Sequence, residues 1–361
     1  MFLILIGLIF TKPLFAHPLD LGLLIIANDG GEEISVRLEM NPLIGSQLLG
    51  IDSFAFSEKP DPFKAGLFKK TLGMSNLKFN NSLCSWSDPK QLRVENSQLL
   101  SLTAFAECPH PSGKVTLSLP YLKQMQRSYR LMYVAKLNAT EHVGDADPSH
   151  TVIEFTAGNA SPTVGHFDGM GLSHIGVIPS EWRSGGGWRI PFGIDHILFV
   201  FALILSSGSL LNLMKMITGF TLGHTFSLAL AAFGVFQVSG RWVEASIALT
   251  IAYVSFLAVC YRRPKHSWRV AIGIGLIHGL GFAAALGDLH LSLKGMLKAI
   301  LGFNLGVEIG QMFIILILFP LVFYIRKNAS EKMLVLRSAS LGIGLVSFYW
   351  FIQRGFGPWL R

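Results

Sequence analysis

The stretch GIDHILFVFALIL, residues 193–205, decides the fold of the C-terminal half because it sets His196 inside an otherwise apolar run. Two later stretches repeat this feature: GFTLGHTFSLALAAF contains His224, and IGIGLIHGLGFAAAL contains His278. Ionisable side chains are costly in hydrocarbon, so those that recur on several membrane spans usually face one another and mark a pathway or a site. The sequence therefore predicts a helical membrane domain with a polar site inside it.

A fourth apolar stretch, LGFNLGVEIGQMFIILILF, carries Asn304, Glu308 and Gln311. These residues are four and three positions apart, so they share one face of a helix. Imidazole together with carboxylate is a common donor set for a divalent transition metal such as Ni²⁺, Co²⁺ or Zn²⁺. The predicted metal-binding residues are Asp195, His196, His224, His278 and Glu308, with Asn304, Gln311, Thr221 and His174 as supporting polar residues.

The composition agrees with a membrane protein. The chain has 361 residues, of which 51% are hydrophobic and only 14% are charged, whereas about a quarter is charged in a typical soluble domain. The net charge of +8 would suit a nucleic-acid partner, but many of the Lys and Arg residues lie in short connections between apolar spans. There is no basic and aromatic patch of the kind that nucleic-acid binders show, so that class is excluded.

The chain divides into segments of different character. Residues 1–16 resemble a signal peptide. Residues 17–165 contain short runs rich in β-branched and aromatic residues, separated by turn-prone stretches, which predicts an exported, mainly β, sandwich-like domain. An interfacial linker follows at residues 166–191, and residues 192–361 form the transmembrane domain. Cys84 and Cys108 both lie in the exported segment, where a disulfide can persist, and the sequence leaves a bridge or two free thiols open.

The transmembrane domain contains about six spans, each near the length of about 20 residues that a bilayer crossing requires. The predicted spans are 193–209, 214–236, 243–262, 268–287, 299–325 and 334–352. If the β-rich domain is exported, the loops that fall on the cytoplasmic side carry most of the Lys and Arg, as the positive-inside rule requires. The sequence therefore predicts a bacterial inner-membrane protein, with the N-terminal domain and the C-terminus on the periplasmic side.

Five segments together resemble the HupE/UreJ family, specifically its branch with an exported N-terminal domain. They are SHIG (173–176), GIDHILF (193–199), FTLGHTFSL (220–228), HGLGFA (278–283) and GFNLGVEIGQ (302–311). The resemblance implies a hydrogenase or urease accessory protein or a nickel permease, and it implicates Asp195, His196, His224, His278 and Glu308. Nickel permeases typically have a further His a few residues before the Asp-His pair, whereas here the nearest one, His174, is separated from it by an insertion rich in Gly and Trp.

Three functions remain open. The first is an inner-membrane permease for a divalent transition metal, whose other partner would be a system that matures a metalloenzyme. The second is a membrane-embedded metal-dependent hydrolase, in which the histidines hold the metal and Glu308 is the general base. The third is a sensor or assembly factor whose membrane half only anchors the exported domain, which leaves the histidines unexplained.

Overall fold

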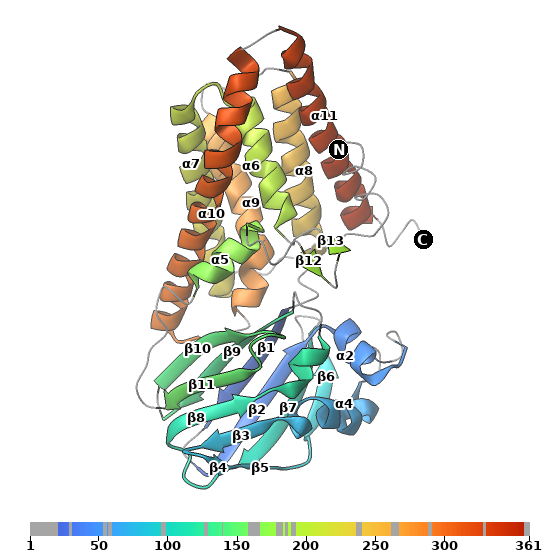
Figure 1. The fold of residues 1–361 in the computed structure, drawn as a ribbon, viewed down its shortest axis with the longest axis vertical. Helices are drawn as coiled ribbons and strands as arrows, with labels where there is room; N and C mark the ends of the chain where they lie inside the picture. The colour runs from blue at the N-terminus through green and yellow to red at the C-terminus, as the bar shows by residue number, and fades with distance from the viewer. Residues whose placement is uncertain are drawn as a thin grey trace.

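The computed structural model separates a β-rich N-terminal half from a helical C-terminal half (Figure 1). It describes residues 21–28, 31–52, 56, 60–94, 99–125, 129–138, 140–157, 167–177, 183–184, 187–188, 193–235, 240–260, 267–287, 291–327 and 330–356. The expected order of a mainly β region followed by a helical region is confirmed. The predicted signal peptide lies outside the described residues.

Two sheets form the N-terminal half, which we call the sandwich. The larger sheet has the strand order β10-β9-β1-β2-β7-β5, with β6 also paired to β7, and the smaller has the order β11-β8-β3-β4. Strand bounds are β1 Leu21–Ala27, β2 Glu33–Met40, β3 Asn76–Phe79, β4 Ser82–Leu83, β5 Ser85–Trp86, β6 Gln91–Val94, β7 Leu100–Glu107, β8 Gly113–Ser118, β9 Arg130–Leu137, β10 Thr140–Ala146 and β11 Val152–Ala157. Short helices on the chain are α2 Pro42–Leu49, α4 Lys64–Lys70, η1 Asp61–Phe63, η2 Leu72–Met74 and η3 Pro120–Gln124.

The continuous apolar run of β1, LGLLIIA, reflects burial on both faces of the larger sheet. Leu24 and Ile26 point into the core shared with the smaller sheet, whereas Leu23 belongs to the hydrophobic core of the helical half. Successive side chains of a strand point to opposite faces, so a strand buried on both sides cannot alternate apolar and polar residues. Within the sandwich, Cys84 and Cys108 form a disulfide.

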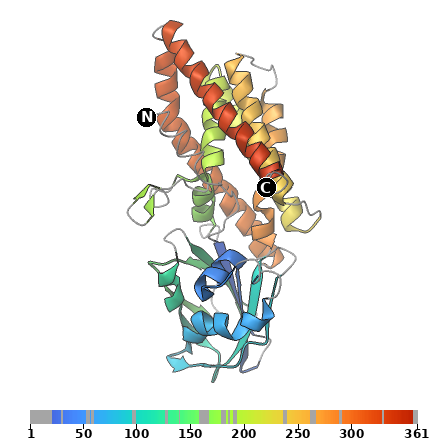
Figure 2. The same cartoon turned by 90° about the vertical axis from the view of Figure 1, so that its right-hand side faces the viewer.

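The helical half contains a short helix and a bundle of longer ones (Figures 1 and 2). Their bounds are α5 Asp168–Ile175, α6 Ile194–Ser206, α7 Leu210–Ala232, α8 Gly240–Val259, α9 Ser267–Gly287, α10 Leu293–Lys327 and α11 Ser330–Phe356, and β12 Arg183–Ser184 pairs with β13 Gly187–Trp188 between α5 and α6. Among the described residues, three segments are long and apolar enough to cross a membrane, namely Gly240–Val259, Leu293–Arg326 and Leu334–Phe356, and Ile194–Ser206 is a shorter apolar helix.

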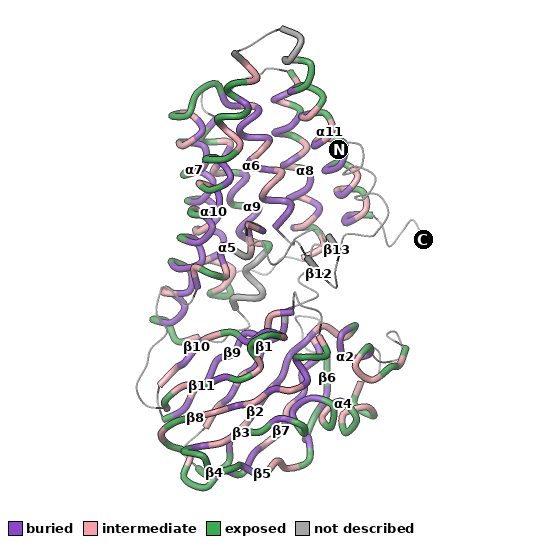
Figure 3. Tube along the Cα trace, in the orientation of Figure 1, coloured by how far each residue is buried: buried purple, intermediate pink, exposed green. Residues whose placement is uncertain are grey.

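Exposed residues lie along the outside of this bundle (Figure 3), and many of them are large and hydrophobic. Phe226 on α7, Phe256 on α8 and Leu316 on α10 are each more than half exposed. Contiguous exposed apolar surface of this kind marks a membrane or a partner interface. Together with the three apolar helices, it indicates that the helical half faces lipid.

Glycines bring two pairs of helices into close contact. A Cβ added at Gly275 of α9 would lie 2.1 Å from the Phe220 carbonyl oxygen of α7, and one at Gly279 would lie 2.2 Å from the His224 carbonyl oxygen. Gly275 and Gly279 therefore act as a small-xxx-small pair that lets the two helices approach closely. In the same way, a Cβ at Gly171 of α5 would lie 2.0 Å from the Phe303 carbonyl oxygen of α10.

The sandwich is attached to one end of the bundle, which we call the domain-proximal end; the opposite end, where α6 stops and α7 begins, is the distal end (Figures 1 and 2). Met132 and Val143, on the face of the larger sheet away from the smaller one, join the hydrophobic core of the helices. The carboxylate of Glu141 on β10 accepts hydrogen bonds from the Ser292 amide at 3.0 Å and from the Ser292 hydroxyl at 2.7 Å, just before α10. A carboxylate at a helix N-terminus is favourable because of the helix dipole.

Candidate metal centre

Three histidines from three different helices converge inside the bundle. One ring nitrogen each of His174 on α5, His196 on α6 and His224 on α7 all lie within 4.8 Å of one another. The ring centroids of His174 and His196 are 4.5 Å apart, and those of His196 and His224 are 6.4 Å apart. This spacing is compact enough for one metal ion to be held between the three imidazoles after small side-chain movements.

The position of His174 depends on how the chain returns to the bundle after the insertion that separates His174 from Asp195 and His196. Residues 168–175, which the sequence places in an interfacial linker, form α5 and pack against α10. Gly176 has φ +74°, which a glycine adopts without strain, and Gly193 lies against it: a Cβ at Gly193 would be 2.2 Å from the Gly176 nitrogen. The insertion thus leaves and rejoins the bundle at one point, and His174 is brought beside His196.

A hydrogen-bond chain fixes the orientation of His224. The Nδ1 atom of His224 lies 3.0 Å from the Oδ1 atom of Asn304, whose amide Nδ2 donates to the Ile300 carbonyl at 2.8 Å. Because an amide oxygen only accepts, His224 carries its proton on Nδ1. Its Nε2 atom is buried without a hydrogen-bond partner among the described residues, so it presents a lone pair of the kind that metals bind.

His278 on α9 is oriented by a similar chain. Its Nε2 atom lies 2.9 Å from the Thr250 hydroxyl, which donates to the Ile247 carbonyl at 2.7 Å. The hydroxyl oxygen therefore accepts from His278, and the buried Nδ1 atom keeps its lone pair. The ring centroid of His278 is 5.5 Å from that of His196. His278 is next to the three-histidine cluster but is not one of its members.

The two predicted acidic ligands occupy different surroundings. Asp195 is buried and forms a bidentate ion pair with Arg354 of α11, at 2.9 and 3.2 Å. Its carboxylate is therefore committed to a guanidinium, and it is not in the group of close metal-binding atoms. Glu308 is half-buried one helical turn beyond Asn304. Within the described part of the chain, its carboxylate has neither a hydrogen bond nor an ion pair.

The supporting polar residues Thr221 and Gln311 also meet across helices. The Thr221 hydroxyl donates to the Gln311 Oε1 atom at 3.4 Å, one turn further toward the distal end than the bond between His224 and Asn304. Gln311 is fully buried. The predicted polar faces of α7 and α10 therefore lie against each other at two successive levels.

Sequence reasoning underrated one residue and missed two. It treated His174 as a supporting group, although the structure places it in the cluster with His196 and His224. It also missed Thr250 and Arg354. Thr250 has a usable signal, because it lies among apolar residues in the middle of its span, but Arg354 follows the apolar part of the last span and looks like an ordinary membrane-end residue.

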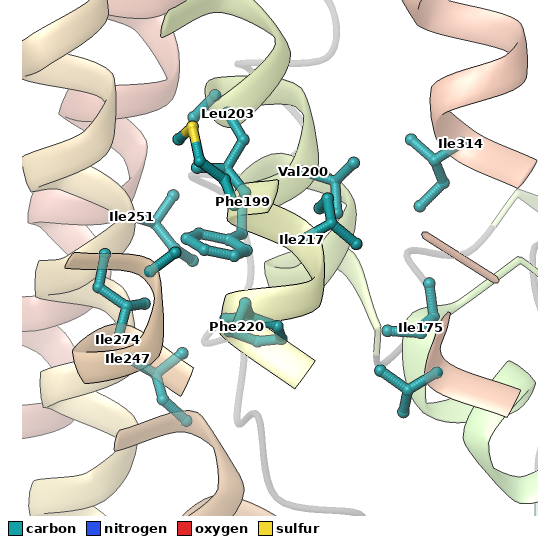
Figure 4. Close-up of a cluster of buried hydrophobic side chains, with 14 of the residues drawn as sticks. Ile175, Phe199, Val200, Leu203, Ile217, Phe220, Ile247, Ile251, Ile274 and Ile314 are labelled. Atoms are coloured by element: carbon teal, nitrogen blue, oxygen red, sulfur yellow. The ribbon is translucent and has the colours of Figure 1, made fainter. Parts of the chain in front are cut away.

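Aromatic side chains contact the histidines, and two of them, Phe199 and Phe220, belong to the buried hydrophobic cluster of the bundle (Figure 4). The rings of Phe199 and Phe220 have centroids 4.7 Å apart, and each lies 5.1 Å from the ring of His278. Phe303 stacks on His224 at 6.0 Å. Imidazoles with open nitrogens in such an apolar shell can bind a divalent transition metal, which is the chemistry this arrangement fits.

Comparison with known families agrees with this geometry. The family described as HupE / UreJ protein matches residues 177–354, which include α6–α10 and nearly all of α11. The helical half belongs to the HupE/UreJ family. No curated protein matches the chain. The matched region begins just after α5, so His174 lies outside it. The other two histidines of the cluster, His196 and His224, lie inside the matched region.

Proposed function

We propose that the HupE/UreJ half is a permease for a divalent transition metal, Ni²⁺, Co²⁺ or Zn²⁺, and that the ion is its cargo. The observation that supports this most strongly is the convergence of ring nitrogens from His174, His196 and His224. Metals bind neutral imidazole, and the hydrogen bond to Asn304 leaves a nitrogen of His224 available for this purpose. Affinity alone does not choose among these metals.

The charges around the cluster favour binding that is reversible. The Asp195 carboxylate is neutralised by Arg354, so it positions the start of α6 and does not hold the ion itself. Glu308, one turn beyond Asn304 on α10, is then the carboxylate that would replace water around a cation that moves past the cluster toward the distal end. Three neutral imidazoles and one carboxylate leave a divalent ion incompletely neutralised, and conduction requires binding that is weak enough for release.

The proposed location is the bacterial inner membrane, with the sandwich in the periplasm. The disulfide between Cys84 and Cys108 supports this side, because disulfides persist in oxidising compartments. In this orientation the domain-proximal end receives the ion and the distal end releases it to the cytoplasm. A maturation system for a metalloenzyme, such as a hydrogenase or urease, is the proposed consumer.

The second candidate is a hydrolase. It is favoured by the carboxylate of Glu308, which has no ion-pair partner among the described residues. Three histidines, with this carboxylate one helical turn from the Asn304 that bonds His224, resemble a zinc site with its general base. Under this proposal Glu308→Gln abolishes cleavage of a membrane substrate while the metal stays bound. Full activity of that variant would eliminate Glu308 as the base.

Metal uptake into proteoliposomes containing a trapped metal-sensitive dye tests the permease. We expect Co²⁺ and Ni²⁺ uptake by the wild type and its loss in His174→Ala, His224→Ala and His278→Ala. The matched control is His142→Ala, which removes a buried histidine of the sandwich. Uptake at the wild-type rate in all three bundle variants would overturn the permease.

A further inference from the structure

The stripe of α7 that carries His224 changes chemical character in three steps. Counting toward the distal end in steps of four residues, His224 is followed by Phe220, Met216 and Asn212. Residues four apart lie on one face of a helix, so the stripe passes from imidazole to aromatic ring to thioether to amide. A histidine level, an apolar level and a polar level follow one another along the helix.

Two neighbouring helices repeat this order. The equivalent residues are His196, Phe199, Leu203 and Ser206 on α6, and His278, Ile274 and Ser267 on α9. The levels coincide in space, because Phe199 and Phe220 contact each other and both contact His278. The change of character is therefore shared by α6, α7 and α9, whereas the side of α7 that faces α10 meets it through the polar pair of Thr221 and Gln311, one turn beyond His224.

On the side of α7 that faces α6, α8 and α9, hydrophobic side chains make up the apolar level among the described residues. Phe199 and Phe220 are fully buried, and Leu203, Ile251 and Ile274 lie around them (Figure 4). None of these side chains offers an atom that replaces water around a cation. An ion that leaves the cluster toward the space between α6, α7, α8 and α9 must displace the two rings, since hydrophobic constrictions block ions by excluding water.

Beyond the rings lies a small pocket. It has a volume of about 30 Å³ and is lined by Leu203, Ser206, Asn212, Met216, Val254, Leu257, Ser267, Val270, Ala271 and Ile274. This is room for about two water molecules. The Ser267 hydroxyl donates to the Asn212 Oδ1 atom at 3.2 Å, and the Asn212 amide donates to the Met216 sulfur at 3.5 Å. Polar atoms thus reappear directly past the apolar level.

We infer that Phe199 and Phe220 form a gate between the histidine cluster and a second, weaker cation site in this distal pocket. The inference rests on the proposed permease function. The amide oxygen of Asn212, the hydroxyls of Ser206 and Ser267 and the sulfur of Met216 would hold a divalent cation that keeps part of its water. Weak ligands of this kind suit a release site, because an ion that has left the imidazoles must not be held as firmly again.

The gate is tested by comparing Phe220→Ala with Phe226→Ala, which removes a lipid-facing ring from the same helix. Binding of Co²⁺ is followed by its visible absorption, and uptake is followed in proteoliposomes. We expect Phe220→Ala to bind Co²⁺ as the wild type does, to take it up several-fold faster and to lose the ability to hold a preloaded gradient. Phe226→Ala should match the wild type in all three measurements.

Equal rates in Phe220→Ala, Phe226→Ala and the wild type would overturn the gate while leaving the permease intact. Absence of uptake by the wild type would overturn both. If Phe220→Ala does not bind Co²⁺, Phe220→Leu replaces it and is compared with Phe199→Ala and the wild type. A rate of Co²⁺ leakage in Phe220→Leu between the rates of the wild type and Phe199→Ala supports the gate. Leakage at the wild-type rate in both Phe220→Leu and Phe199→Ala overturns it.

The pocket is tested by thiol labelling in a Cys260→Ser background. Ser206→Cys should react with a membrane-impermeant thiol reagent added from the distal side, and Co²⁺ should slow this reaction. Ser255→Cys, buried on α8 outside the pocket, is the isosteric control and should not react. Ser206→Cys that is unreactive, or that reacts at the same rate with and without Co²⁺, would overturn the second site.

Discussion

The sandwich and the bundle each bury a histidine with an unpaired nitrogen, yet only the bundle builds a site. In the sandwich, His142 packs on Phe155 at 4.7 Å, and burial lowers the pKa of its imidazole. Its Nε2 atom has no hydrogen-bond partner among the described residues, as is also true of His224. The two histidines differ in their neighbouring side chains: His224 lies beside two other imidazoles, whereas His142 lies against an aromatic ring. Convergence, and not burial, distinguishes a metal site from a core histidine.

The two halves also reach stability by different means. The sandwich is linked covalently by its disulfide and has an ion pair between Arg130 and Asp147 near its edge. The bundle relies on close glycine contacts between helices and on the buried pair of Asp195 and Arg354. Perturbing one half should therefore leave the other largely intact, and the following experiments test this separation.

The largest effect is expected from breaking the buried ion pair. Arg354→Met leaves the Asp195 carboxylate buried without a partner, which destabilises a protein by about 3–5 kcal/mol. Thermal unfolding in detergent, followed by helical circular dichroism, measures the loss. The double variant Asp195→Asn/Arg354→Met should recover much of it. A single variant as stable as the wild type would show that the pair does not hold α6 to α11.

Removing the disulfide should affect the sandwich alone. Cys84→Ala/Cys108→Ala opens a loop of 24 residues, which costs about 3 kcal/mol by the chain-entropy estimate. Hydrogen exchange should rise in β5 and β7, while Co²⁺ binding by the bundle stays unchanged. Loss of Co²⁺ binding in this variant would instead show that the sandwich is needed to shape the metal centre.

Loss of the amide behind His224 should weaken metal binding without abolishing it. Asn304→Leu removes the acceptor that fixes the His224 tautomer, and such changes reduce metal affinity by roughly 10–100-fold. Titration with Co²⁺ measures the affinity, and His142→Ala provides a control from the other half. Unchanged affinity in Asn304→Leu would mean that the hydrogen bond does not orient the ligand.

The smallest effect concerns the pH dependence of the sandwich. Burial alone would raise the pKa of Asp147, but hydrogen bonds from Ser149 and His150 outweigh it and lower the pKa to about 2. The stabilisation is therefore present above the ordinary carboxyl pKa near 4 and is lost as the pH falls from about 4 to about 2. Asp147→Asn should cost roughly 2 kcal/mol at pH 7.

Hydrogen exchange of β9 and β10 in the full chain measures this difference between the wild type and Asp147→Asn. The gap between the two proteins should shrink as the pH is lowered and close near pH 2. A gap that is independent of pH would assign the effect of the substitution to lost packing and not to the charge.

Local patterns predicted the elements well where each element has one dominant environment. The mainly β character of the N-terminal half and the apolar helices of the C-terminal half follow from periodicity and composition. Gly275 and Gly279 are small residues four positions apart, a spacing that allows a close helix contact, but only the structure identifies α7 as the partner of α9. The expectation of about six spans is supported only in part, since three described segments meet the length and hydropathy of a span. In α7, Asn212, Lys215 and His224 lower the hydropathy, because a helix that lines a polar site is not uniformly apolar.

The sequence by itself determined which residue types are carried into the bundle: imidazoles on separate apolar helices, and an amide and a carboxylate on one face of α10. Only the tertiary structure decided how they are paired. It brought Gly193 against Gly176 so that His174 reaches His196, and it turned Asp195 toward Arg354, 159 residues later. Helical periodicity fixes the face on which a side chain lies, but the partner on that face depends on how distant helices pack, and no local pattern encodes that packing.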